Sequence, residues 1–445
     1  MKRTILPLSI LCLSTAACDL GKPGDLGDLT DSTTGAETTD DSASSTPATD
    51  TNEPTTSASA GEETGDDTTG GLAPATAIDV LFVIDNSGSM ASAQQRIADA
   101  IDEFVDPITS AGLDLRVAIT TTDAGNPRCP STTPENGALV ATSCRARVPD
   151  GEFVSADTDF SSACLDTCQH DAIEILPTTT ASDPVASPRP WVEWSPDTSN
   201  VDVPLVEALA CLIPQGVAGC GFESQLGSLA KSIARMTAPD DPASGFLRTN
   251  AHFVAILLTD ETDCSYNPEF DEIFTSNKVF WFDPETDVAP TSSMCWTAGM
   301  QCSGGPGVYD DCVPTDKNSA GQATPDPDAA VLTPISSINS VLDDVQASKL
   351  AAGSAAKVQL ITIGGVPAGY PQNPLVYADG DDNDYVSLFG IGPGCNYMDM
   401  ITAAPPGRIL DVVEANSPLV QGMYSICQPN LAGPLSAIAL GITGN

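Results

Sequence analysis

The chain has 445 residues, with 60 Asp and Glu against 17 Lys and Arg and a formal net charge of −43. So large an excess of negative charge argues against nucleic acid as a partner. It favours cations or basic partners, and the simpler interpretation is that it keeps the protein soluble.

The N-terminus has the features of an export signal. Two basic residues precede the apolar run 5–13, which is too short to span a bilayer. Small residues then lead to Cys18, as in bacterial lipoproteins, whose signals are cleaved before a cysteine that receives the lipid. We therefore expect residues 1–17 to be a signal peptide and Cys18 to anchor the protein to a membrane, facing the periplasm or the cell surface. Thr15 stands where such signals usually have leucine, so secretion without a lipid is the alternative.

The cysteine count fits an exported protein. Of 14 cysteines, Cys12 would leave with the signal and Cys18 would carry the lipid, so an even number remains and all can pair. Zinc is the alternative for Cys164 and Cys168, which have ligand-like spacing, but the chain has only 2 His, so disulfides are favoured. Their connectivity cannot be read from the sequence. The remaining cysteines are Cys129, Cys144, Cys164, Cys168, Cys211, Cys220, Cys264, Cys295, Cys302, Cys312, Cys395 and Cys427.

Residues 18–75 are mostly Ser, Thr, Gly, Asp and Glu after the cysteine. So few large apolar residues cannot offset the entropy of ordering, and the stretch is predicted to be a disordered tether between the membrane and a folded part. Residues 76–445 then suffice for one large core with insertions or for two domains.

Apolar strands and amphipathic helices alternate in this second part. Residues 77–84 form a short apolar run rich in β-branched residues, as in a strand buried on both faces. A helical pattern over 91–110 and a strand at 113–122 complete a βαβ unit, which implies parallel pairing. Further elements are a helix at 226–236, a strand at 252–258, a helix at 338–345, a strand at 358–363 and a helix around 435–439. The alternation predicts an α/β fold with a doubly wound, mostly parallel, Rossmann-like sheet.

Two long stretches interrupt this alternation, at about 124–199 and 262–334. Both contain cysteines and are rich in Pro, Gly, Asp and Thr. We interpret them as disulfide-stapled insertions that carry short strands or helices of their own. Trp191 and Trp194 in the first are interpreted as packing anchors.

The first predicted strand leads into a turn with three hard oxygen donors, Asp85, Ser87 and Ser89. Alternate positions on such a turn can converge on one small cation, and oxygen-only sites favour Mg²⁺ or Mn²⁺ over zinc or copper. The spacing alone is a weak signal, because residues 40–44 repeat it inside the predicted tether. Residues 85–89 differ from residues 40–44 because they lie between a predicted strand and a predicted helix. This position places their oxygen donors at the carboxyl end of the sheet, where ligands bind.

Residues 80–90 resemble the opening strand and metal-binding loop of von Willebrand factor type A (VWA) domains, and residues 252–260 resemble the central strand of that family, which ends in Thr-Asp. The chain resembles bacterial VWA lipoproteins. The resemblance implies a metal-ion-dependent adhesion site holding Mg²⁺ or Mn²⁺, with Ca²⁺ less favoured, and one position left for an acidic side chain of a partner. The implied ligands are Asp85, Ser87, Ser89 and Asp260.

The sequence departs from the family at the place of a further ligand, a threonine in the loop before the helix that precedes the central strand. Residues 219–224 occupy this place and contain no threonine. Glu223 or Ser224 can substitute, and Glu223 is favoured because its side chain is longer and charged. A third carboxylate at the metal would fill or shield the open position and weaken the capture of an acidic partner.

Other acidic residues are predicted to surround the site without binding the ion. Asp123 ends the strand expected beside the first, and Glu261 and Asp263 follow the central strand. Residues 379–384 form a possible calcium loop, but they lack the turn glycine and distant Glu of an EF-hand, so an ordinary acidic turn is favoured.

These observations predict an extracytoplasmic binding or adhesion protein whose divalent metal engages a protein or cell-surface ligand. An enzyme is the less favoured class, because the sequence contains no GxSxG, GxxxxGK[ST] or HExxH motif and its only imidazoles are His170 and His252. Two alternatives stay open. One is a metal-assisted hydrolase, and the other is a scaffold without functional metal in which Ser87 or Ser89 only caps the following helix.

Overall fold

The computed structural model describes residues 72–398 and 400–444. The predicted signal peptide, Cys18 and nearly all of the predicted tether lie outside the described residues. Within the described ranges no helix is both long enough and apolar enough to cross a membrane.

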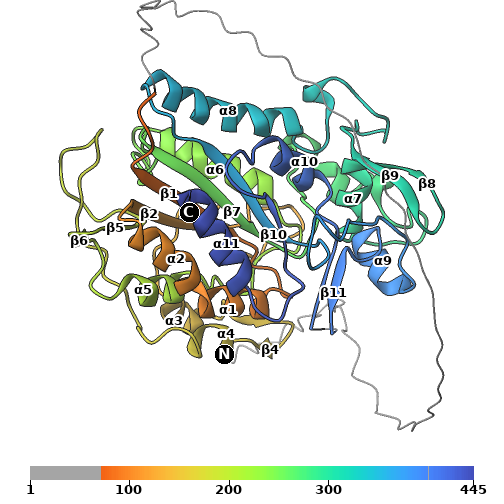
Figure 1. Cartoon of the computed structure of the whole chain (residues 1–445). Coiled ribbons are helices and arrows are strands. Elements are labelled where there is room, and N and C mark those ends of the chain that lie inside the picture. Colours follow the sequence, from red (N-terminus) through yellow and green to blue (C-terminus); the bar gives the residue numbers. More distant parts are fainter. Residues whose placement is uncertain (1–71, 399, 445) are drawn as a thin grey trace, which may run out of the picture. The chain divides into compact units, whose positions relative to one another are not determined.

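A mixed α/β fold is built around a seven-stranded, mostly parallel sheet (Figure 1) with the strand order β13-β10-β7-β1-β2-β5-β6. Its four central strands are parallel to one another and almost entirely buried, which accounts for their near-continuous apolar sequences. They are β1 (Ala77–Ile84), β2 (Asp114–Thr121), β7 (Ala251–Leu258) and β10 (Val358–Gly364). All four lie within two residues of their predicted bounds.

The edges of the sheet were not predicted. β13 (Met423–Ser425) adds a short parallel strand beside β10. At the other edge β5 (Val192–Ser195) and β6 (Thr198–Ser199) pair antiparallel to β2 and to each other. Both belong to the stretch 124–199, so part of the first predicted insertion extends the central sheet.

Helices cover both faces of the sheet (Figure 1). One face packs side chains such as Phe82 and Ile256 against four helices, and the other packs Leu81 and Leu257 against three. The first set is α1 (Ala91–Asp99), α2 (Ile101–Ser110), α5 (Leu205–Leu212) and α11 (Ala432–Thr443). The second set is α6 (Gln225–Thr237), α8 (Ile335–Ala351) and α10 (Arg408–Ala415). A parallel sheet with two helical layers agrees with the predicted arrangement.

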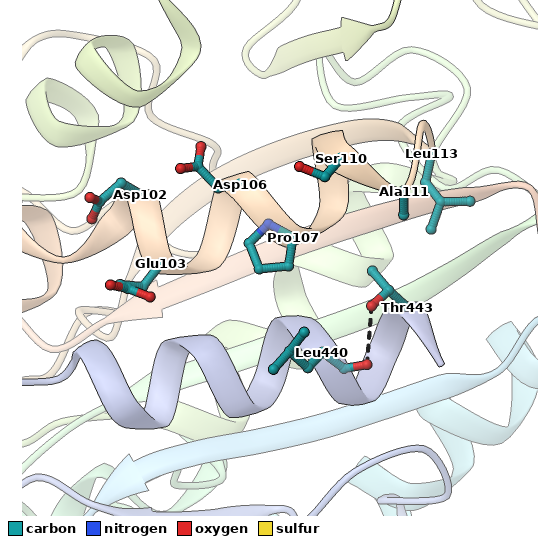
Figure 2. Close-up of a pocket in the computed structure, with 9 residues that line it drawn as sticks. All are labelled: Asp102, Glu103, Asp106, Pro107, Ser110, Ala111, Leu113, Leu440 and Thr443. Atoms are coloured by element: carbon teal, nitrogen blue, oxygen red, sulfur yellow. Dashed lines mark hydrogen bonds between the residues drawn. The ribbon is translucent and has the colours of Figure 1, made fainter. Parts of the chain in front are cut away.

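The single helix expected over 91–110 is divided in the structure. Its apolar spacing continues through the break at Ala100, which is neither α-helical nor marked by Gly or Pro, so no sequence signal announces the division. Beyond the break α2 runs beside α11, and an open pocket between them is lined by Asp102, Glu103, Asp106 and Leu440 (Figure 2).

Short elements occupy both predicted insertions and the segment before α10. The α-helices are α3 (Cys144–Arg147), α4 (Ser162–Leu165), α7 (Ser293–Gly299) and α9 (Asn383–Phe389), with 3-10 turns at Val148–Asp150, Pro268–Phe274, Lys278–Phe280 and Pro327–Ala329. Two-stranded hairpins are formed by β3 (Val154–Ser155) with β4 (Thr158–Asp159), β8 (Met300–Gly304) with β9 (Tyr309–Pro314), and β11 (Cys395–Tyr397) with β12 (Ile401–Ala403). Trp191 is buried edge-on against Phe246, with ring centroids 5.5 Å apart, as expected of a packing anchor.

Six disulfides use all the cysteines of the described residues, as predicted from the parity of their number. Cys164 and Cys168, the pair with zinc-like spacing, belong to two different bridges and are not free to bind metal. The bridges are Cys129–Cys220, Cys144–Cys164, Cys168–Cys211, Cys264–Cys295, Cys302–Cys312 and Cys395–Cys427.

Candidate metal centre

The register of the sheet brings three strand ends to one level. Ile84 at the end of β1 pairs with Thr121 of β2 and with Leu258 of β7, so the residues that follow leave the sheet side by side. The backbone keeps this register one step further, because the Asp85 amide donates to the Leu258 carbonyl at 2.9 Å. Side chains far apart in the sequence therefore meet at this carboxyl edge.

Asp85 is fully buried and held on both carboxylate oxygens. Its Oδ1 accepts a hydrogen bond from the Ser87 amide at 2.9 Å, and its Oδ2 accepts one from the Thr259 hydroxyl at 2.6 Å. Burial raises the pKa of Asp85 despite these bonds. The carboxylate is thus fixed where the loop begins.

The two serine hydroxyls lie together on the turn. Ser87 Oγ and Ser89 Oγ are 3.3 Å apart, and Ser89 is the exposed member of the pair. A hydrogen bond from the Ser89 side chain also reaches Asp260 at the end of β7. Neither serine caps the following helix, because α1 has Met90 at its N-cap position and no side-chain cap. The capping role considered for these hydroxyls is therefore not the one they have in the structure.

Asp260 joins the loop from the neighbouring strand, as the sequence predicted. It is 6% exposed, and its Oδ1 has no hydrogen-bond partner among the described residues. Burial is the main cause that raises the pKa of Asp260 to about 7, and the charge of Asp85 acts in the same direction. Asp85 and Asp260 are far apart in the sequence, and the parallel pairing of β1 with β7 brings them together.

Glu223 comes from the loop that precedes α6 and is fully buried. The Thr122 hydroxyl donates to its Oε2, while its Oε1 has no partner among the described residues. Burial, the Asp85 charge and the Glu261 charge raise the pKa of Glu223 well above its ordinary value. Ser224, the alternative to Glu223, directs its hydroxyl to the Cys264 carbonyl at 3.4 Å. Of the two, Glu223 is the residue that lies with the other acids.

Glu261 also lies with the other acids, more closely than the sequence indicated. Burial raises its pKa well above the ordinary value, with the charges of Asp85 and Asp260 acting in the same direction. The Ser292 hydroxyl, next to α7, donates to Glu261 Oε2 at 3.1 Å. Tyr385 of α9 has a buried hydroxyl that finds no hydrogen-bond partner within the described ranges, and its pKa is raised by burial and by the charges of Asp260 and Glu261. No sequence pattern pointed to Ser292 or Tyr385.

The other candidate acids have structural partners. Asp263 forms a buried ion pair with Arg408 at 2.9 Å and accepts the Leu226 amide at the start of α6. Asp123 accepts hydrogen bonds from the backbone amides of Gly125 and Cys220. In 379–384, Asp379 accepts a hydrogen bond from the Tyr309 hydroxyl and Asp382 caps α9, as in an ordinary acidic turn.

Four buried carboxylates thus share one small region without a basic partner. No Lys, Arg or His of the described residues forms an ion pair with Asp85, Glu223, Asp260 or Glu261. Unpaired buried charge is strongly unfavourable, so this arrangement calls for a cation or for protons.

The donor set fits a hard divalent cation. Two carboxylate oxygens, Glu223 Oε1 and Asp260 Oδ1, are buried without a hydrogen-bond partner among the described residues. The Ser87 and Ser89 hydroxyls lie 3.3 Å from each other, and the Ser89 side chain hydrogen-bonds to Asp260. All are oxygen donors, as Mg²⁺ and Mn²⁺ prefer. The one set of three Cys, His, Asp or Glu ligand atoms within 4.8 Å of one another in the described part is the disulfide-bonded Cys144, Cys164 and Cys168. Among the described residues, no three of these acids bring carboxylate oxygens within 4.8 Å of one another.

Two disulfides anchor the loops that carry these residues. Cys129–Cys220 ties the first insertion to the loop before Glu223, and Cys264–Cys295 joins the start of the second insertion, just after Asp260, to α7. The two loops are also bonded to each other, since the Cys264 amide donates to the Glu223 carbonyl at 2.7 Å. Both insertions therefore contribute to the surroundings of the site.

Comparison with known proteins adds little to this description. No family model matches the sequence, and no curated protein matches it. Among solved structures, a pilus adhesin, SpaC from Lactobacillus rhamnosus GG, is similar over 83% of this chain with 12% identity and a TM-score of 0.29. This chain spans only 31% of the length of that adhesin. A likeness this weak carries no argument about fold or function.

Proposed function

We propose that this protein is an extracytoplasmic binding protein in which a VWA-like sheet presents Mg²⁺ or Mn²⁺ to a protein or cell-surface ligand. The observation that carries the proposal is that Asp260 Oδ1 after β7 and Glu223 Oε1 before α6 are buried without a hydrogen-bond partner in the described part of the chain. The Ser87 and Ser89 hydroxyls lie on the turn after β1, which pairs with β7. The proposed ligands are Asp85, Ser87, Ser89, Asp260 and Glu223.

Neighbouring residues hold the proposed metal ligands in position. Thr259 and the Ser87 amide orient Asp85, and Thr122 orients Glu223, so the acids are positioned before any ion arrives. Ser89 is exposed and marks the side from which a ligand can approach. A bound dication would supply a Lewis-acid centre that accepts an oxygen atom of the ligand.

Export is supported by the six disulfides, which form and persist in oxidising compartments. Attachment to the membrane through a lipid on Cys18 is part of the proposal.

A binding role is preferred over catalysis because no imidazole lies near the acids. His252 opens β7 at the opposite end of the strand and accepts the Lys357 amide through Nδ1 at 3.0 Å. His170 lies in the first insertion and pairs with Glu207 at 2.7 Å. General acid–base chemistry at the proposed metal would have to use carboxylates alone.

The proposal is tested by titrating the metal-free protein with Mn²⁺ in a calorimeter. We expect one bound Mn²⁺ per chain in the wild type and at least a tenfold lower affinity for Asp85→Ala, because loss of one carboxylate ligand weakens a divalent site. Asp40→Ala is the matched control, since it alters the same DxSxS spacing in the predicted tether. Equal affinity in wild type and Asp85→Ala would remove the site from the mechanism.

A further inference from the structure

A polar pocket lies at the amino edge of the sheet, at the opposite end of the central strands from the candidate metal centre. Its volume of about 490 Å³ is typical of small-molecule sites. Asp114 and Arg116 of β2 and Arg248 before β7 line it, together with β5, β6 and the segment 176–178. The first predicted insertion therefore builds part of a pocket that the proposed metal site does not use.

The charged groups of this pocket are nearly balanced. Arg248 is paired with the buried Asp79 at 2.7 Å, and Arg116 is paired with Glu193 at 3.0 Å. Asp114 is the one further charged residue in the lining. Charges that already neutralise one another attract an anion or a cation only weakly. The pocket therefore favours an uncharged ligand.

The paired side chains still leave hydrogen-bonding capacity. Glu193 Oε1 accepts hydrogen bonds from the Trp191 indole at 2.7 Å and from Arg116 at 3.0 Å. Both bonds use the same oxygen, so Glu193 Oε2 is left for another donor. Two atoms of lining residues, Arg116 Nε and Thr178 Oγ1, are buried without a hydrogen-bond partner in the described part of the chain. Such atoms are normally satisfied by water or by a bound group.

Hydroxyl groups and one aromatic ring complete the lining. Ser195 Oγ and Thr198 Oγ1 lie 3.0 Å apart where β5 turns into β6. Trp194 pairs with Leu115 across the ladder of β5 and β2, and its half-buried side chain both packs against the core and lines the pocket. An indole ring among hydroxyls and charged groups suits a ligand that is apolar on its faces and polar at its edges.

We propose that this pocket binds a neutral saccharide. A pyranose ring carries vicinal hydroxyls that both donate and accept, which complements the free oxygen of Glu193 and the hydroxyls of the β5–β6 turn. Its C–H faces complement the ring of Trp194. A charged sugar would bring a charge for which the balanced pocket holds no free partner. The proposal does not depend on the metal site.

The experiment is saturation-transfer difference NMR on the disulfide-bonded protein with a chelator present. Glucose, galactose and mannose are the probes, and each is compared with its uronate and with its 2-amino derivative. We expect at least one neutral hexose to bind with a millimolar Kd, about tenfold more tightly than its charged derivatives. The charged derivatives keep the ring and change only the charge.

Three variants locate the hexose in the protein. Glu193→Gln removes the charged acceptor at nearly constant volume and should weaken binding about tenfold. Thr198→Val removes an exposed hydroxyl away from the core and should weaken binding about threefold. Glu174→Gln, at an exposed position of the same insertion that does not line the pocket, should leave the Kd within about twofold of the wild type.

The outcomes separate this proposal from the metal site. Asp85→Ala should bind the hexose as the wild type does, so a failure of the metal site would leave this result intact. The saccharide proposal is overturned if no neutral hexose binds at millimolar concentration or if a charged derivative is preferred. An affinity unchanged in both Glu193→Gln and Thr198→Val would also overturn it, as would a loss in Asp85→Ala equal to that in Glu193→Gln.

Discussion

The stability of the metal-free protein should fall as the pH rises, and Asp260→Asn should remove much of this fall. Asp260 is buried, and its pKa is raised from 3.8 to about 7, mainly by burial and in addition by the charge of Asp85. In the unfolded chain the same carboxyl ionises near its ordinary value. Between the two pKa values the folded state therefore binds a proton that the unfolded state has lost, and stability decreases with pH.

The expected size follows from the shift. One pKa unit corresponds to about 1.4 kcal/mol, so a shift of about three units lowers the free energy of unfolding by roughly 4 kcal/mol between pH 4 and pH 7. Below pH 4 both states are protonated and the contribution is fully present; above pH 7 both are ionised and it is lost. Glu223 and Glu261 are shifted in the same direction and add to the fall.

The measurement is guanidinium unfolding at several pH values between 4 and 7, with the disulfides intact and a chelator present. Asp260→Asn should lose less stability over this range than the wild type by at least ~1 kcal/mol, and Asp240→Asn, at an exposed turn, should behave as the wild type. Saturating Mn²⁺ should abolish or reverse the wild-type slope, because the ion favours the ionised carboxylates. A slope that is identical in the wild type and in Asp260→Asn when the chelator is present would refute the reasoning.

Two further substitutions test the framework of the site. A Cβ at Gly219 would collide with the Asn86 side chain, whereas a Cβ at Gly221 meets nothing within 4 Å. Gly219→Ala should therefore weaken Mn²⁺ binding at least tenfold in calorimetry. Gly221→Ala, the control, should leave the Mn²⁺ affinity within twofold of the wild type. Asp263→Ala leaves the buried Arg408 without its partner and should cost about 3–5 kcal/mol in chemical denaturation. A loss below ~1 kcal/mol would mean that this ion pair does not hold the loop.

The central part of the fold could be predicted because burial on both faces leaves a strong sequence signal. The four central strands are apolar runs of seven or eight residues, and each was found within two residues of its predicted bounds. The edge strands β5, β6 and β13 have only two to four residues and are partly exposed, so neither periodicity nor apolar content distinguishes them from loops.

Residue patterns alone could predict the candidate site only where it lies on strand ends, and Glu223 before α6 was indicated by the family resemblance. Asp85 and Asp260 follow buried strands, and the parallel register of β1 and β7 brings them together. Ser292 and Tyr385 reach the candidate site from segments whose paths depend on disulfide pairing and loop packing. Glu261 was predicted to lie outside the ligand set, because its burial depends on those same segments. Long-range placement of this kind leaves no local pattern in the sequence.

The measurement that tests the central claim most directly is anomalous X-ray diffraction from crystals of the protein soaked in Mn²⁺. We predict a single strong Mn²⁺ peak within coordination distance of the Ser87 hydroxyl, with Asp85 or Asp260 in its surroundings directly or through water. The acidic pocket between α2 and α11 (Figure 2) serves as the internal comparison. A peak in that pocket and none at the ends of β1 and β7 would contradict the account.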